Sequence, residues 1–157
     1  LQEAGAPVIQ FDEPAILKYK DDMALLEEVS EIVTQDLHVK TELCTYFNDV
    51  SGLTPELYQL PFQMFGLDFA WGTENLNSLE DFPADKELVI GLLDARNTRL
   101  ESLEEIIAVV RQVNTHVSLD RLHLSPSCGL DFLPRKNARE KLSRLVEGTK
   151  AAQQALE

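Results

Sequence analysis

The sequence predicts an α/β domain in which helices cover a parallel sheet, and three observations support this fold class. Apolar runs of strand length alternate with segments whose apolar residues recur every three or four positions, as in amphipathic helices. The runs are apolar almost throughout, which is typical of parallel strands buried on both faces. Unusual polar residues follow where the runs end, and parallel α/β folds bind ligands at the carboxyl ends of their strands.

Five segments are predicted to be strands because they are rich in apolar, β-branched or aromatic residues and lie between turn-forming residues. In chain order they are residues 7–11, 39–47, 62–69, 87–94 and 121–125. The fourth, with the sequence ELVIGLLD, is nearly all apolar.

Five helical segments are predicted between and after these strands. They begin near Asp21 or Asp22, Thr54, Thr73, Ser102 and Pro134. Ser102 and Glu105 have the spacing of a capping box. The last helix, residues 134–156, is expected to turn one set of side chains inward, namely Ala138, Leu142, Leu145, Val146, Thr149 and Ala152.

Two architectures contain such a sheet, the doubly wound domain and the (β/α)8 barrel. A barrel has eight strands and about 250 residues, whereas this chain has 157 residues. A complete doubly wound domain fits that length better. However, no Gly-rich phosphate-binding fingerprint follows any predicted strand, which weighs against a nucleotide-binding domain of that kind. The residues alone leave both architectures open.

Composition excludes several classes of protein. The chain has 14 Lys and Arg against 27 Asp and Glu, a net charge of −13. Such a surface repels phosphate, so neither nucleic acid nor an anionic membrane is expected as a partner. No apolar run approaches the roughly 18 residues of a transmembrane helix. Two cysteines cannot form a disulfide-rich framework, and we expect a reduced, cytoplasmic compartment.

Four residues form a candidate metal site. Glu42 and Cys44 are two positions apart in a predicted strand and therefore share a face. Asp68 and Cys128 follow neighbouring strands. Zinc accepts both thiolate and carboxylate ligands. The alternative is that the two cysteines are small buried residues without a metal.

Two further residues at strand ends could contact a ligand. Asp12 ends the first strand, and its carboxylate could bind an ammonium group through a charge-assisted hydrogen bond. The alternative is that this carboxylate caps a turn. Trp71 follows the third strand and either stacks on a ring of the substrate or only covers the rim of the sheet.

Five motifs, in this order, carry a resemblance to a known family. They are IQFDEPA (residues 9–15), TELCTYFND (41–49), GLDFAWGTENL (66–76), GLLDARNTRLES (91–102) and SPSCGLDFLPR (125–135). Together they resemble the cobalamin-independent methionine synthase family over nearly the whole chain.

The resemblance implies a (β/α)8 barrel of which this chain supplies about strands four to eight with their helices. Residues 1–157 are then a single domain, the C-terminal portion of one barrel, and the sequence begins with Leu1 because earlier strands are absent. We expect such a piece to associate with itself or with the missing half. The family transfers a methyl group from methyltetrahydrofolate, or in some shorter relatives from a methylcorrinoid, to the thiol of homocysteine.

The resemblance also implies roles for individual residues. The family's zinc ligands follow the pattern His-x-Cys, then Glu, then Cys. Cys44 and Cys128 match the two cysteines, Glu42 stands at the His position, and Asp68 stands at the Glu position. Asp12 matches the aspartate that contacts the amino group of homocysteine.

Several motifs resemble the family's N-terminal, non-catalytic barrel more than its catalytic one, namely TYFND, LDFAWGTENL, DARNTR and SPSC. That barrel does not normally bind zinc. Two readings therefore accompany the homocysteine methyltransferase: a non-catalytic barrel that supports or docks onto a separate zinc-bearing chain, and an inactive fragment.

Overall fold

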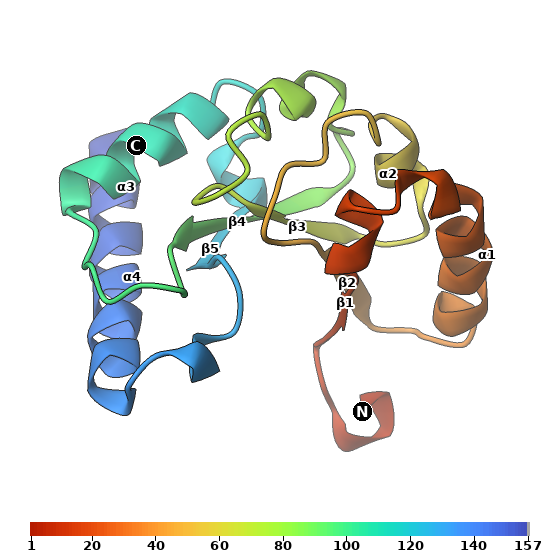
Figure 1. Cartoon of the computed structure of the whole chain (residues 1–157), viewed down its shortest axis with the longest axis horizontal. Helices are drawn as coiled ribbons and strands as arrows, with labels where there is room; N and C mark the ends of the chain where they lie inside the picture. The colour runs from red at the N-terminus through yellow and green to blue at the C-terminus, as the bar shows by residue number, and fades with distance from the viewer. Residues whose placement is uncertain (157) are drawn as a thin grey trace.

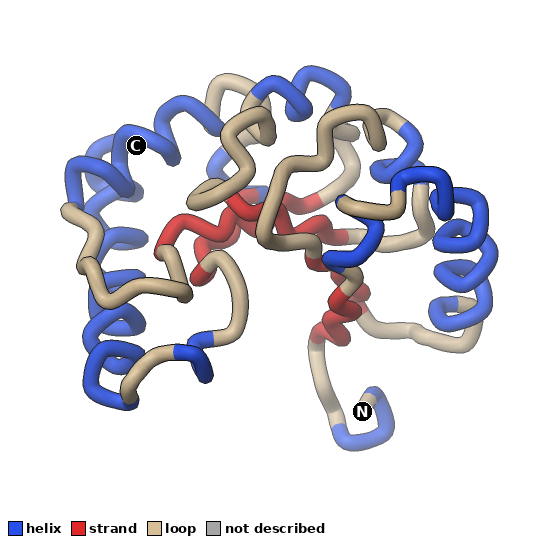
Figure 2. The backbone as a smooth tube through the Cα atoms, viewed as in Figure 1, coloured by secondary structure: helices blue, strands red, loops and turns tan. Residues whose placement is uncertain are grey.

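The computed structural model describes residues 1–156 and contains one parallel sheet of five strands in the order β1-β2-β3-β4-β5. The strands are β1 (Val8–Asp12), β2 (Lys40–Cys44), β3 (Met64–Asp68), β4 (Glu87–Leu93) and β5 (Leu122–Pro126). Helices and loops form an arc around the strands, as Figures 1 and 2 show. The predicted parallel α/β sheet is confirmed.

Four α-helices are assigned within residues 1–156. They are α1 (Met23–Thr34), α2 (Glu56–Gln59), α3 (Leu103–Val113) and α4 (Arg135–Leu156). Short 3-10 turns cover Gln2–Ala4, Pro14–Leu17, Lys20–Asp22, Asn77–Asp81, Leu119–Arg121 and Leu130–Phe132. The capping box predicted for α3 is present, with the Glu105 backbone N–H 3.1 Å from Ser102 Oγ and the Ser102 N–H 2.7 Å from Glu105 Oε2.

The short helical stretch predicted from Thr73 toward Leu79 is present only in part, because tight turns come first and a 3-10 helix follows at Asn77–Asp81. The Gly72 N–H donates to the carbonyl of Asp68 at 3.0 Å, and the side-chain amide of Asn75 donates to the same carbonyl at 2.8 Å. Asn75 is fully buried, and its side-chain oxygen accepts the N–H of Val50 at 2.9 Å. These bonds fasten the chain to the end of β3 before a regular helix can begin.

The second strand is shorter than predicted and ends at Cys44 rather than at Phe47. Phe47 has a φ of 82°, a left-handed conformation that no strand contains. Its N–H donates to the carboxylate of Asp68 instead of to a neighbouring strand. The chain therefore turns out of the sheet sharply at this point.

Strand register places the candidate residues at one edge of the sheet. Asp12 is paired with Cys44, and Cys44 with Gly66, across β1, β2 and β3. Asp68 is paired with Gly91 of β4. Since all five strands are parallel, their carboxyl ends meet along this edge.

The hydrophobic core lies between the sheet and the helices. Its aromatic part is formed by Tyr58, Phe62, Phe65 and Phe82, whose rings meet edge to face. Helices α3 and α4 approach closely at Gly148, where an added Cβ would lie 2.5 Å from Ile106 Cδ1.

Two predicted inward positions of the last helix, Leu142 and Val146, are wrong: these side chains are 48% and 54% exposed. The apolar stripe of α1 is also open, with Leu25 and Ile32 each 58% exposed. Helix α4 flanks β5 and helix α1 flanks β1, the two edge strands of the sheet. Within residues 1–156, no further strand or helix lies beyond these edges to cover the exposed side chains. Ala152 of α4 is buried as predicted. No helix in residues 1–156 is long and apolar enough to cross a membrane.

Candidate functional site

A cavity of about 640 Å³ runs along the sheet, from Val8 and Met64 at the starts of strands to Asp12, Cys44 and Cys128 at or after their carboxyl ends. Asp12 of β1, Glu42 and Cys44 of β2, and Cys128 after β5 all line it. Four of the five residues predicted for the site are therefore brought to one cavity. The fifth, Asp68, does not line it.

Glu42 and Cys44 lie together over Gly66. A Cβ at position 66 would lie 2.6 Å from Cys44 Sγ and 2.8 Å from Glu42 Oε1. The missing side chain of Gly66 therefore makes the space that both functional groups occupy. Glu42 is buried, and Cys44 is partly buried.

Burial and surrounding negative charge keep both groups of β2 protonated to a higher pH than usual. Burial raises the pKa of the Cys44 thiol to about 12, and the carboxylates of Glu42, Asp12 and Asp68 add to the effect. Burial also raises the pKa of Glu42, with nearby His123 opposing and Asp12 adding to that shift. A thiol and a carboxyl group that resist ionisation thus stand side by side in the cavity.

Asp68 organises the backbone around it. Its Oδ2 accepts the N–H of Phe47 at 2.9 Å, and its Oδ1 accepts those of Ala70 and Trp71 at 2.8 and 3.0 Å. The side chain is fully buried, which raises its pKa, while the three N–H donors act in the opposite direction. Both carboxylate oxygens are engaged in fixing the loops that follow β2 and β3.

Cys128 follows β5 and is partly buried. Burial raises the pKa of its thiol, as do the charges of Asp68 and Asp94, while a hydrogen bond from Ser127 and the charge of Arg96 lower it. The adjacent Ser127 is buried, and its Oγ accepts the N–H of Ala95 at 3.1 Å. The loop carrying Cys128 is thus fastened to the end of β4.

Asp12 is exposed at the mouth of the cavity and accepts the side-chain amide of Gln10 at 2.6 Å. The neighbouring Glu13, rather than Asp12, caps the following 3-10 turn by accepting the N–H of Ala15 at 3.0 Å. The alternative role of a turn-capping carboxylate thus belongs to Glu13. Within residues 1–156, no backbone N–H donates to the carboxylate of Asp12.

The four predicted zinc ligands do not form a closed metal site as they are arranged. Within residues 1–156, no group of three or more His, Cys, Asp or Glu side chains is placed to bind a metal ion. Both oxygens of Asp68 already accept backbone N–H groups, and this side chain does not line the cavity. The donor types match zinc chemistry, but this arrangement does not fit it, and zinc binding stays a prediction from the resemblance.

The structure adds contacts that sequence spacing did not indicate. The guanidinium carbon of Arg96 lies 4.9 Å from the ring centre of Phe47 and 5.2 Å from that of Trp71. Three different loops contribute these residues, so no local pattern could join them. The one available signal was a lone cation, Arg96, directly after a strand rich in apolar residues.

Comparison with known proteins identifies the family. Residues 1–151 match the family model described as "Cobalamin-independent synthase, Catalytic domain". The chain belongs to this family. The resemblance inferred from the five motifs is thereby confirmed.

Curated members of the synthase family align along the whole chain. The methionine synthase of Saccharolobus islandicus (strain Y.G.57.14 / Yellowstone #1) is 34% identical over 158 residues, covering 99% of this chain and 47% of the relative. The methionine synthase of Pyrococcus horikoshii is 30% identical over 158 residues, covering 100% and 46%. The chain thus spans about half the length of the curated relatives it matches.

A solved synthase structure has the same fold. The B12-independent methionine synthase from Shewanella sp. W3-18-1, solved in complex with selenomethionine, superposes with a TM-score of 0.85 at 22% identity. The match covers 99% of this chain and 51% of that one. The predicted fold class, α/β of the (β/α)8 barrel type, is confirmed, and the sheet formed by residues 1–156 is open.

Proposed function

We propose that this chain is part of a homocysteine S-methyltransferase of the cobalamin-independent type. The methyl donor is methyltetrahydrofolate or a methylcorrinoid, and the product is methionine. The observation that carries the proposal is the convergence of Asp12, Glu42, Cys44 and Cys128 in one cavity, within a chain that matches the family's catalytic-domain model. Ligands of (β/α)8 barrels bind at the carboxyl ends of the strands, and Asp12, Cys44 and Cys128 lie at or directly after those ends.

Asp12 would bind the ammonium group of the amino acid. It is exposed at the mouth of the cavity, and an ionised carboxylate forms strong, short hydrogen bonds with ammonium donors. Such a contact orients the substrate, so that its side chain extends toward β2 and β5. Asp12 acts in binding and in placing the thiol, rather than in the chemical step.

Glu42 would accept the proton of the substrate thiol. Its raised pKa makes it a stronger base than an exposed carboxylate. The thiol proton moves to Glu42, and the resulting thiolate attacks the methyl carbon. A sulfur–carbon bond forms, and the bond between the methyl group and the donor breaks, with its electron pair remaining on the donor. Where the donor is methyltetrahydrofolate, its nitrogen then takes up the proton held by Glu42.

Methionine formation by the intact protein tests the proposal. With homocysteine and either methyltetrahydrofolate or methylcobalamin, we expect turnover with one of the two donors. Asp12→Asn should raise the KM for homocysteine at least tenfold, since it loses a charge-assisted bond. The matched control is Asp36→Asn, an exposed aspartate between α1 and β2. Absence of methyl transfer with both donors would contradict the proposal.

A second function is favoured by two observations: both oxygens of Asp68 accept backbone N–H groups, and Glu42 stands at the family's His position. In this reading the chain belongs to a non-catalytic barrel that supports a separate zinc-bearing chain. Methyl transfer that appears only after mixing with such a chain would favour it. Metal analysis of the intact protein and of Cys44→Ser tests zinc binding separately.

A further inference from the structure

A cluster of three side chains lies at the carboxyl-end rim beside the cavity: Phe47, Trp71 and Arg96, here called the arginine–aromatic cluster. We infer that this cluster binds a carboxylate group of a substrate, with Arg96 as the binding residue. The inference rests on the proposed function, because it concerns the two substrates of methyl transfer.

The guanidinium of Arg96 is placed to bind an anion along its edge. Its carbon lies 4.9 Å and 5.2 Å from the two ring centres, which is within range of a cation–π contact. Across the part of the chain that is described, no side-chain hydrogen bond or ion pair engages this guanidinium. A guanidinium carries five N–H donors in a fork that matches the two oxygens of a carboxylate. Arg96 therefore has its donors available while its position is restricted.

The aromatic members are fixed by a single buried carboxylate. Asp68 accepts the backbone N–H of Phe47 through one oxygen and that of Trp71 through the other. Both aromatic side chains are nonetheless 41% and 49% exposed. The left-handed φ of 82° at Phe47 adds a local conformational cost that the bond to Asp68 helps to offset.

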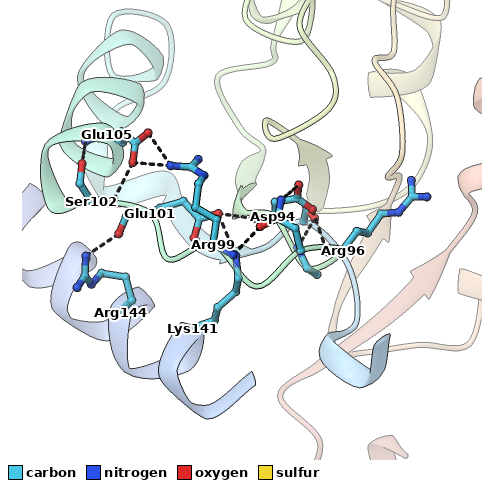
Figure 3. Close-up of polar contacts among 11 residues, drawn as sticks. Asp94, Arg96, Arg99, Glu101, Ser102, Glu105, Lys141 and Arg144 are labelled. Atoms are coloured by element: carbon cyan, nitrogen blue, oxygen red, sulfur yellow. Dashed lines mark hydrogen bonds and ion pairs between the residues drawn. The ribbon is translucent and has the colours of Figure 1, made fainter. Parts of the chain in front are cut away.

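The loop that carries Arg96 is held in place by a buried ion pair, drawn in Figure 3. Lys141 Nζ lies 3.0 Å from Glu101 Oε1, and the same oxygen accepts the N–H of Asp94 at 2.9 Å. The carboxylate of Asp94 in turn accepts the N–H of Arg96 at 2.9 Å. The side chain of Arg96 extends away from the Glu101–Lys141 pair, as Figure 3 shows. A chain of contacts from α4 thus sets the loop that presents Arg96.

The negative charges around the cavity leave Arg96 as the position suited to bind an anion. The chain carries a net charge of −13, and Asp12 and Glu42 line the cavity itself. A substrate carboxylate would be repelled by these groups in the absence of a cation. Ala95, the residue before Arg96, donates its N–H to Ser127 Oγ at 3.1 Å, and Ser127 directly precedes Cys128 of the cavity wall. An anion bound by Arg96 is therefore placed beside the cavity rather than on a remote surface.

Two substrate groups have this chemistry: the α-carboxylate of homocysteine and the glutamate carboxylates of methyltetrahydrofolate. Calorimetric binding to the intact protein, without turnover, separates them. One arm compares homocysteine with 3-aminopropane-1-thiol, which lacks the carboxylate. The other compares methyltetrahydrofolate with the amide of methyltetrahydropteroate, which has neither the glutamate nor any free carboxylate. Each ligand is titrated into the unmodified protein, Arg96→Gln and Arg111→Gln, the last removing an equal charge from an exposed site on α3.

We expect Arg96→Gln to weaken binding of one carboxylate-bearing ligand about tenfold or more, because a charged hydrogen bond is lost. The ligand lacking that carboxylate should bind both proteins equally, and Arg111→Gln should bind as the unmodified protein does. Equal binding by Arg96→Gln in both arms, or no binding of either carboxylate ligand by the unmodified protein, would overturn the inference. A protein that binds in this manner yet transfers no methyl group would contradict the proposed function alone.

A purely structural role for Arg96, pinning three loops together, is distinguished by a second readout. The thermal midpoint of Arg96→Gln should stay close to that of Arg111→Gln, because both residues are exposed and neither forms an ion pair within residues 1–156. A large fall in the midpoint for Arg96→Gln, together with equal weakening of all four ligands, would assign Arg96 to loop structure and overturn the binding role.

Discussion

Lys141 and Glu101 form an ion pair whose side chains are almost completely removed from water. Lys141 Nζ lies 3.0 Å and 3.1 Å from the two carboxylate oxygens, and the two side chains are 1% and 5% exposed. Arg144 also donates to the backbone carbonyl of Glu101, at 2.6 Å. Helix α4 is thereby fixed to the loop between β4 and α3, which forms part of the carboxyl-end rim.

Replacing Lys141 should be strongly destabilising. Lys141→Met leaves the carboxylate of Glu101 buried without its cation, which costs about 3–5 kcal/mol of the free energy of unfolding. The control is Lys136→Met on the same helix, where the ion pair with Glu140 is exposed and is worth about 0–1 kcal/mol. Urea unfolding measures both. Equal losses in the free energy of unfolding for the two variants would show that the buried ion pair stabilises the fold no more than the exposed one.

A side chain at position 66 should disturb the cavity. Gly66→Ala places a methyl group against Cys44 Sγ and Glu42 Oε1, and displacing them should cost about 1–3 kcal/mol. Gly129→Ala is the matched control, since its Cβ would meet only the end of the Asp131 side chain, at 3.0 Å. Chemical denaturation compares the two. If Gly66→Ala is as stable as Gly129→Ala, the two groups of β2 do not occupy the space above Gly66.

Glu42 should make the protein less stable as the pH rises. Because the folded state raises the pKa of this carboxyl group, the folded chain binds more protons than the unfolded chain between the two pKa values. The free energy of unfolding then falls as the pH increases through that window, which begins at the unfolded value of about 4.3. Glu42→Gln removes this fall and should gain stability relative to the unmodified protein toward neutral pH.

Glu87 provides a control of opposite sign for this pH dependence. A hydrogen bond from Lys40 lowers the pKa of Glu87, and His123, at 2.7 Å, acts in the same direction. Its stabilising contribution is therefore present above the unfolded pKa and is lost as the pH falls. Urea unfolding from pH 4 to pH 7 should show Glu87→Gln losing stability toward neutral pH. Parallel pH profiles for the Glu42 and Glu87 variants would refute both assignments.

Cys44 should be much less reactive than Cys128. Its pKa of about 12 leaves little thiolate at neutral pH, and only the thiolate is alkylated rapidly. Iodoacetamide at pH 8, followed by peptide mass spectrometry, should label Cys128 first. In denaturant the two rates should converge, which controls for intrinsic reactivity. Faster labelling of Cys44 in the folded protein would mean that its thiol is ionised, as a bound cation would require.

Sequence pattern predicted the sheet well because buried parallel strands leave a signal in consecutive residues. The run from Glu87 to Asp94 could be recognised without any knowledge of its neighbours. The segment after Thr73 could not, since its conformation depends on Asn75 reaching the end of β3 and the loop after β2. The inward side of α4 was also misjudged at Leu142 and Val146, because periodicity identifies an apolar face but not whether another element covers it.

The candidate site was predictable in its parts and not in its connections. Strand alternation placed Glu42 and Cys44 on one face, and the parallel sheet brought Cys128 to the same cavity. The role of Asp68 was hidden, since nothing in its own segment indicates that both oxygens accept backbone N–H groups from two loops. The link from Lys141 through Glu101 to Asp94 joins residues 47 positions apart in the chain (141 minus 94) and leaves no local pattern.

A crystal structure of the intact protein soaked with homocysteine tests the central claim most directly. The account predicts the amino acid in the carboxyl-end cavity, with its ammonium group at Asp12 and its sulfur between Glu42, Cys44 and Cys128. Homocysteine bound elsewhere on the molecule, with this cavity empty, would contradict the account.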